Sequence, residues 1–86
     1  MNTQDITRSP AKLKVLAFFH KNPSVIDTAR SIAIWTKENP ALVKRVLEDL
    51  VEAKILVTHR TSSTTAYAYT QDDKIISAVA KILEKI

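Results

Sequence analysis

The chain has 86 residues and a mass of 9.6 kDa, which matches one small domain and argues against a second. It is 45% hydrophobic and 26% charged, so it is expected to fold around a core, and its net charge of +4 permits binding to a polyanion. It contains no cysteine and no glycine, which excludes disulfides, thiolate metal sites and the glycine-rich loops that hold nucleotide phosphates.

The first predicted helix begins at Pro10, with Ser9 as its cap. Serine caps free backbone N–H groups, and proline suits the first helical position because its missing donor is not needed there. Apolar residues recur at three- and four-residue spacings from position 13 to 19. Asn22-Pro23 ends the helix, with Asn22 expected in the left-handed cap conformation.

A second, short helix is predicted to start at Asp27 or Thr28, after the β-prone pair Val25-Ile26. Its apolar stripe includes Trp35, which is therefore expected in the core together with the two phenylalanines. Asn39-Pro40 then repeats the combination of cap and proline and opens a third helix that runs to about residue 53.

A β-hairpin is predicted after the third helix. Residues 55–58 are apolar and β-branched, residues 61–64 are polar, and residues 65–70 alternate alanine with tyrosine. Thr70 is expected to cap a fourth helix, with Asp73 three residues later as in a capping box. The predicted fold is mainly α with a small hairpin, an α+β fold in the order α-α-α-β-β-α.

This order resembles that of winged helix-turn-helix domains, and in particular of transcriptional regulators of the MarR and PadR type. The run NPALVKRVLEDLVEAKILVTHR from Asn39 resembles their recognition helix and first wing strand, and Tyr67-Ala68-Tyr69-Thr70 resembles the motif that closes the wing. The resemblance implies one winged-helix domain over residues 1–86, with the helix-turn-helix core at 9–70 and a C-terminal helix at 71–86.

Two departures from those families concern the end of the third helix and the wing. Lys54 stands where a glycine is usual, so a lysine is expected in the left-handed region at some energetic cost. The wing tip holds threonine and serine instead of a glycine-rich basic loop, which argues against DNA contacts by the tip.

The resemblance implies DNA contacts from the first half of the third helix and the segments around it. Lys44 and Arg45 lie opposite the apolar positions of that helix, where arginine can bind guanine edges and lysine can bind phosphate. The alternative is a solvated helix face, and Glu48, Asp49 and Glu52 would repel phosphate if they faced it. Further candidates, at helix starts, in the turn and at the wing base, are Arg30, Thr36, Lys37, Asn39, Ala41 and Arg60.

The C-terminal helix carries more apolar surface than a small winged-helix core is expected to cover. Its aliphatic residues follow spacings of four, three and four, as in a coiled-coil seam. A homodimer is therefore predicted, with an interface formed by Ile75, Val79, Ile82, Leu83 and Ile86. The alternative is a helix packed wholly on its own domain.

The predicted function is sequence-specific binding of double-stranded DNA by a small dimeric transcriptional regulator. The alternative is a winged-helix module that binds proteins in a replication, segregation or transcription complex. His20 and His59 lie on different elements and match no metal-ligand spacing, so no metal site, cofactor or catalytic residue is expected. Without a signal peptide or a long apolar segment, the protein is expected to be cytoplasmic, with no membrane association. Without a recognisable catalytic residue, no enzyme activity is expected.

Overall fold

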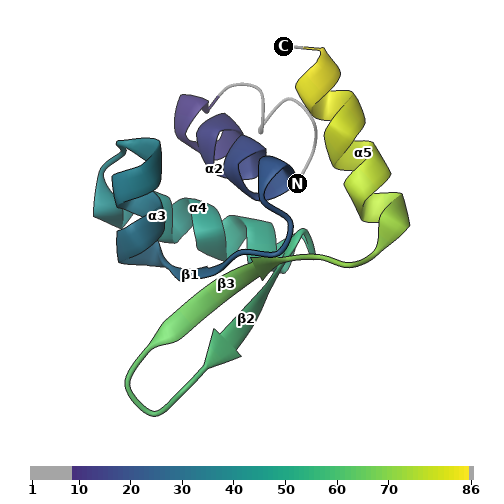
Figure 1. Ribbon diagram of the computed structural model, residues 1–86. Coiled ribbons are helices and arrows are strands. Elements are labelled where there is room, and N and C mark those ends of the chain that lie inside the picture. The colour runs from purple at the N-terminus through teal and green to yellow at the C-terminus, as the bar shows by residue number, and fades with distance from the viewer. Residues whose placement is uncertain (1–8, 86) are drawn as a thin grey trace.

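The computed structural model describes residues 9–85, which form four helices and one three-stranded antiparallel sheet (Figure 1). The elements in chain order are α2 (Pro10–Lys21), β1 (Ile26–Thr28), α3 (Ala29–Thr36), α4 (Pro40–Glu52), β2 (Leu56–Arg60), β3 (Thr65–Tyr69) and α5 (Asp73–Glu84). The predicted four helices and hairpin are confirmed, and β1 is an additional strand. Helix α2 lies between α3 and α5, and the hairpin of β2 and β3 extends away from the helices (Figure 1).

The sheet has the strand order β1-β3-β2. Strands β2 and β3 pair from Leu56 opposite Tyr69 to Arg60 opposite Thr65. Strand β1 adds only three residues to the other side of β3, with Ile26 opposite Ala68. The β-prone pair at 25–26 did not predict a strand by itself, because three residues are too few for an alternating pattern.

The predicted starts of the first three helices are confirmed by their caps. The Ser9 hydroxyl accepts a hydrogen bond from the Lys12 N–H at 3.3 Å, and the Thr28 hydroxyl accepts one from the Ser31 N–H at 3.3 Å. Asn39 caps α4. These bonds satisfy backbone donors that have no partner within the helix.

Two cap predictions were wrong. The N-cap of α5 is Asp72, whose carboxylate accepts from the Lys74 N–H at 2.9 Å, while the Thr70 hydroxyl accepts from the Asp72 N–H at 3.1 Å. Thr70 therefore orders the turn before the helix. Asn22 ends α2 with φ −130°, outside the left-handed region, and its side-chain amide donates to the Phe18 carbonyl at 2.8 Å, which helps to satisfy a carbonyl at the helix end.

The hydrophobic core joins all four helices to the sheet. Phe19 of α2 is fully buried and its ring stacks near that of Tyr69 on β3, with centroids 6.5 Å apart. Burial of each large apolar side chain contributes about 1.5–3 kcal/mol to folding. The largest fully buried side chains are Phe19, Leu16, Ile32, Leu47, Leu50, Leu56, Val15, Val43 and Val79.

The prediction that Trp35 lies in the core was wrong, since its side chain is 68% exposed. Successive residues of an α-helix are about 100° apart, so Ile32 and Ala33 define a buried face that leaves Trp35 beyond its edge. Ile34 points further from the core and is 70% exposed. Of the predicted aromatic core, Phe19 is buried and Phe18 is half-buried.

Lys54, after α4, has φ 66°, as the resemblance to families with a glycine at this position predicted. Replacing Lys54 with glycine should raise the free energy of unfolding by roughly 0.5–1 kcal/mol. The left-handed strain that glycine removes is larger than the cost of the extra backbone entropy that glycine loses on folding. Urea denaturation would measure the change. Lys81→Gly, on a right-handed exposed position inside α5, is the control and should destabilise by about 1 kcal/mol. Equal effects of the two changes would contradict the strain at Lys54.

Candidate nucleic-acid interface

Helices α3 and α4 form a helix-turn-helix joined by residues 37–39. Lys37 adopts the left-handed conformation with φ 58°, and the Glu38 N–H donates to the Ala33 carbonyl at 3.1 Å. Asn39 then caps α4, its side-chain oxygen accepting from the N–H groups of Ala41 at 2.8 Å and Leu42 at 3.2 Å. The turn is therefore fixed by local hydrogen bonds and sets the direction in which α4 leaves α3.

Helix α4 has one face in the core and one in solvent. Val43, Val46, Leu47 and Leu50 are buried and define the inner face. At about 100° per residue, the opposite face is centred on the exposed residues Ala41, Arg45, Glu48 and Glu52. We call these four residues the outer face of α4. Lys44 is also exposed and lies at its side, next to the hairpin.

Two adjoining crevices, together called the wing crevice here, separate α4 from the hairpin. One has a volume of about 300 Å³ and is lined by Lys44, Glu48, Val51, Thr58, Arg60, Thr65 and Tyr67. The other has a volume of about 520 Å³ and is lined by Thr28, Ala29, Arg30, Lys44, the hairpin residues 61–65 and Tyr67. Cationic groups and hydroxyls predominate among these side chains, and both kinds of group bind phosphate oxygens in protein–DNA complexes.

Tyr67 of β3 lies at the centre of the wing crevice, between α4 and the edge strand β2. Burial raises the pKa of its hydroxyl, the negative charge of Glu48 raises the pKa further, and the positive charge of Arg60 lowers it. The hydroxyl is therefore protonated at neutral pH and can donate a hydrogen bond. Tyr67 was not predicted as a site residue. Its sequence signals were the alternation of tyrosine and alanine in β3 and the likeness of Tyr67-Ala68-Tyr69-Thr70 to a wing-closing motif.

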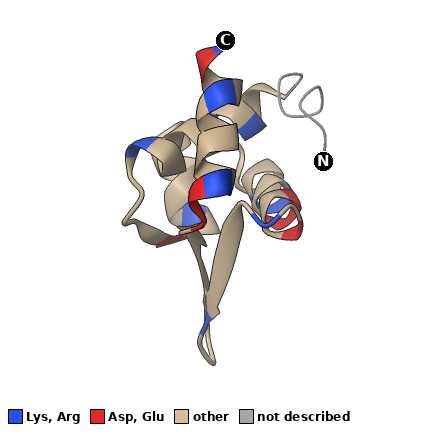
Figure 2. Ribbon diagram, turned by 90° about the vertical axis from the view of Figure 1, so that its right-hand side faces the viewer, with Lys and Arg blue, Asp and Glu red and all other residues tan. Residues whose placement is uncertain are grey.

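Two acidic residues of the helix-turn-helix, Glu38 in the turn and Asp49 on α4, form ion pairs with helix α2. The Lys14 ammonium lies 2.8 Å from the Glu38 carboxylate, and the Lys12 ammonium lies 3.1 Å from that of Asp49. Lys and Arg residues occur on all four helices, whereas Arg60 is the one Lys or Arg residue of the described hairpin strands (Figure 2). The α2 lysines thus offset negative charge near the helix-turn-helix.

The predicted DNA-binding residues divide into two groups. Thr36 is half-buried and its hydroxyl donates to the Ile32 carbonyl at 2.8 Å, and Asn39 uses its side chain as a cap. Both therefore support the turn. The other six are exposed, and three of these border the wing crevice: Arg30, Lys44 and Arg60. Lys37, Ala41 and Arg45 lie outside it, on the turn and on α4.

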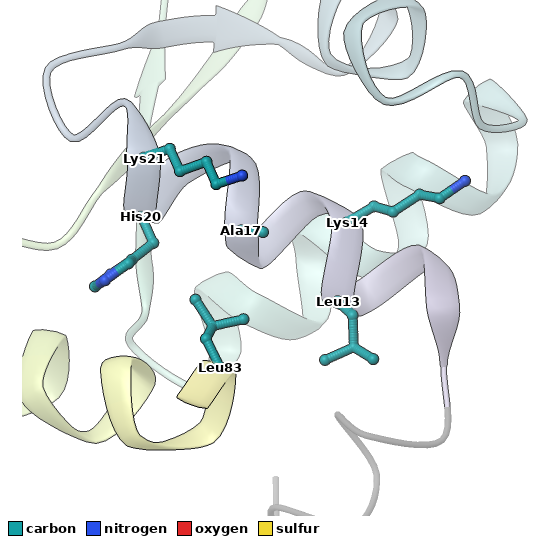
Figure 3. A pocket seen from close by; sticks show the side chains of 6 residues that line it. All are labelled: Leu13, Lys14, Ala17, His20, Lys21 and Leu83. Carbon is teal, nitrogen blue, oxygen red and sulfur yellow. The ribbon is translucent and has the colours of Figure 1, made fainter. Parts of the chain in front are cut away.

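The residues predicted for a dimer interface lie on α5, except that Ile86 is outside the described residues. Val79 is 1% exposed and belongs to the core of its own domain. Ile75, Ile82 and Leu83 are half-buried and pack against that core. Figure 3 shows Leu83 pointing towards α2 across a groove of about 430 Å³ whose other lining residues are Leu13, Lys14, Ala17, His20 and Lys21.

Within residues 9–85, no three metal-ligating side chains of the His, Cys, Asp and Glu types lie together. In the same part of the chain, no helix is long and apolar enough to cross a membrane.

Solved structures with the same fold include those of AntR and ZitR. The antimony-specific transcriptional repressor AntR has a TM-score of 0.70 and 15% identity, over 92% of this chain and 68% of AntR. Lactococcus lactis ZitR in complex with DNA has a TM-score of 0.62 and 21% identity, over 90% of this chain and 53% of ZitR. A second ZitR structure gives a TM-score of 0.64 and 20% identity, over 85% and 49%.

Together with the helix-turn-helix and the hairpin, these likenesses define a winged helix-turn-helix fold, as predicted from the sequence. The chain spans about half the length of ZitR. It matches no protein-family model and no curated protein sequence. The assignment to regulators of the MarR and PadR type stays a prediction.

Proposed function

We propose that this protein is a cytoplasmic transcriptional regulator, resembling those of the MarR and PadR type, that binds double-stranded DNA in a sequence-specific manner. The observation that carries the proposal is the position of Arg45 and Lys44. Both are exposed in the first half of α4, the second helix of the helix-turn-helix, and Lys44 borders the wing crevice together with Arg30 and Arg60. In this fold the second helix of the helix-turn-helix lies in the major groove.

The exposed cations would bind different parts of the DNA in this complex. Arg45 projects from the middle of the outer face of α4 and would bind guanine O6 and N7 with its planar guanidinium. Lys44 and Arg30 border one part of the wing crevice and would hold a phosphate there. Arg60, on the hairpin, and Lys37, in the turn, would bind the backbone on either side.

Two similar structures support the proposal. ZitR has the same fold and was solved in complex with DNA, and AntR is a transcriptional repressor. The ion pairs of Glu38 and Asp49 with α2 also support it, because they reduce the repulsion between the helix-turn-helix and phosphate.

Affinity selection from random DNA duplexes tests the proposal. We expect recovery of a shared sequence of one helical turn or more, bound at least about 10³-fold more tightly than unrelated DNA. Recovery of no shared sequence, with equal affinity for every duplex, would contradict sequence-specific recognition. No binding to any duplex would contradict DNA binding altogether.

We further propose that the protein acts as a homodimer through α5. The half-buried aliphatic residues beside Val79, namely Ile75, Ile82 and Leu83, leave apolar surface that a second copy would cover. Such a pair would bind an inverted repeat with centres about 34–36 Å apart.

Sedimentation equilibrium at micromolar concentration tests the dimer. The wild type should have a dimer mass, and Ile82→Lys should give a monomer because a charge would be buried in the interface. Lys81→Glu, on an exposed position beside it, is the control and should remain dimeric. A monomer mass for the wild type would contradict the proposal.

One observation favours the alternative, a module that binds another protein. Ile34 and Trp35 are adjacent apolar residues on the helix-turn-helix and are 70% and 68% exposed. Exposed apolar and aromatic residues are enriched where proteins bind one another. Changing Lys44 and Arg45 together to glutamate separates this function from DNA binding, because it should weaken DNA binding strongly.

A further inference from the structure

Glu48 occupies an unexpected place for an acidic residue in a DNA-binding surface. It lies at the centre of the outer face of α4, one turn after Arg45, and also borders the wing crevice. Glu38 and Asp49 are each paired with a lysine of α2, whereas no cation of the described residues lies within 4.0 Å of the Glu48 carboxylate. The negative charge that remains unpaired on this face therefore belongs to Glu48 and, further along the helix, to Glu52.

The surroundings of Glu48 reduce its repulsion of the DNA backbone without neutralising it. Lys44, Arg60 and Tyr67 border the same crevice. The two cations would hold phosphate on the hairpin side of α4, whereas Glu48 also projects from the outer face one turn after Arg45, the face that would be turned to the bases. A carboxylate that loses water there is stable only if it accepts a hydrogen bond, so it needs a donor on a base edge.

Two bases offer a donor in the major groove, cytosine through N4 and adenine through N6. The adenine amino group lies between two acceptors, its own N7 and the O4 of the paired thymine, and both repel a carboxylate. The cytosine amino group has an acceptor on one side alone, the O6 of the paired guanine. Cytosine is therefore the favoured partner of a glutamate.

We infer that Glu48 reads a cytosine by accepting a hydrogen bond from its N4 amino group, beside a guanine bound by Arg45. The inference rests on the proposed DNA-binding function and names part of its target. Arg45 and Glu48 are three residues apart, about 4.5 Å along the helix axis, so a helix that lies along the groove would bring them to base pairs that are close together, at roughly 3.4 Å per base pair. Each half-site should thus contain guanine and cytosine in neighbouring base pairs.

The test replaces the carboxylate with an amide of the same shape. Affinity selection and competition by fluorescence anisotropy would compare wild type and Glu48→Gln on duplexes that carry cytosine or adenine at the assigned position. The wild type should prefer cytosine by about 5- to 100-fold. Glu48→Gln should lose this preference or favour adenine, because glutamine binds adenine N6 and N7 together.

Glu52→Gln is the matched control, since it makes the same change on an exposed residue one turn closer to the C-terminal end of α4. It should keep the preference for cytosine, and circular dichroism would show that both variants are folded. If Glu48→Gln binds every duplex more tightly with unchanged base preference, Glu48 only repels phosphate and the inference is wrong. If the wild type selects a sequence but has no preference for cytosine at this position, the inference fails while the proposed function stands. If it binds no duplex, both fail.

Discussion

Raising the salt concentration from 50 to 200 mM should weaken binding of this protein to its DNA site by roughly 10³- to 10⁵-fold. Each subunit presents exposed cations around the helix-turn-helix and the wing crevice, namely Arg30, Lys37, Lys44 and Arg60. A dimer would then neutralise on the order of 6 to 10 phosphates and release the counterions bound to them. Fluorescence anisotropy titrations at several salt concentrations would measure the slope of log affinity against log salt.

Single substitutions show how much each cation contributes to the slope of log affinity against log salt. Lys37→Ala and Arg60→Ala should each reduce it by about 1 for every phosphate that is no longer neutralised, and should weaken binding to specific and random duplexes alike. Lys81→Ala, on the exposed side of α5, removes the same charge away from the helix-turn-helix and should leave the slope unchanged. An affinity that does not vary between 50 and 200 mM salt would contradict an electrostatic complex.

Changing Lys44 and Arg45 together to glutamate should reduce affinity for the selected DNA by roughly 10³-fold or more. Removing a side chain that binds a base or a phosphate costs about 1–3 kcal/mol, so the loss of two such side chains in each half-site of a dimer costs at least about 4 kcal/mol in total. Both residues are exposed and neither forms an ion pair with a described residue, so the change should leave the fold intact. Anisotropy with the selected duplex measures the fall in affinity, and thermal unfolding verifies the fold.

The control is the double change of Lys81 and Lys85 to glutamate, which alters the net charge equally on α5. It separates a local interaction from a general effect of charge, and its fall in affinity should be much smaller. If the Lys44 and Arg45 variant binds DNA like the wild type but no longer binds a protein partner, the protein-binding alternative is correct. Equal falls in affinity for the two double variants would mean that the net charge, and not the face of α4, attracts DNA.

The sequence by itself determined those features that depend on neighbouring residues. Ser9 and Asn39 stand before prolines at helix starts, and their side chains cap α2 and α4 as predicted. The apolar spacing of α4 correctly placed Lys44 and Arg45 on its exposed side. Capping and helical periodicity act over three to seven residues, so a single sequence contains their signals in full.

The limits of local patterns are clearest in α3 and α5. The spacing of four, three and four in α5 assigned Val79 to a dimer seam. Helix α2 packs against α5, however, and Val79 lies in the core of its own domain. In α3, the same type of pattern assigned Trp35 to the core. Periodicity shows which residues share a helix face, but the neighbouring elements decide how wide the buried part of that face is.

Other features were decided only by the tertiary structure. Strand β1 forms because Ile26 meets Ala68 on β3, and the ion pair of Lys12 with Asp49 forms because α2 packs against α4. The wing crevice likewise requires the hairpin to lie beside α4, which brings Tyr67 to Lys44. These partners are more than twenty residues apart in the chain, and no local pattern shows which distant segments will be in contact. Packing of the core decides these contacts, because only the folded arrangement buries the apolar faces of the helices and the sheet together.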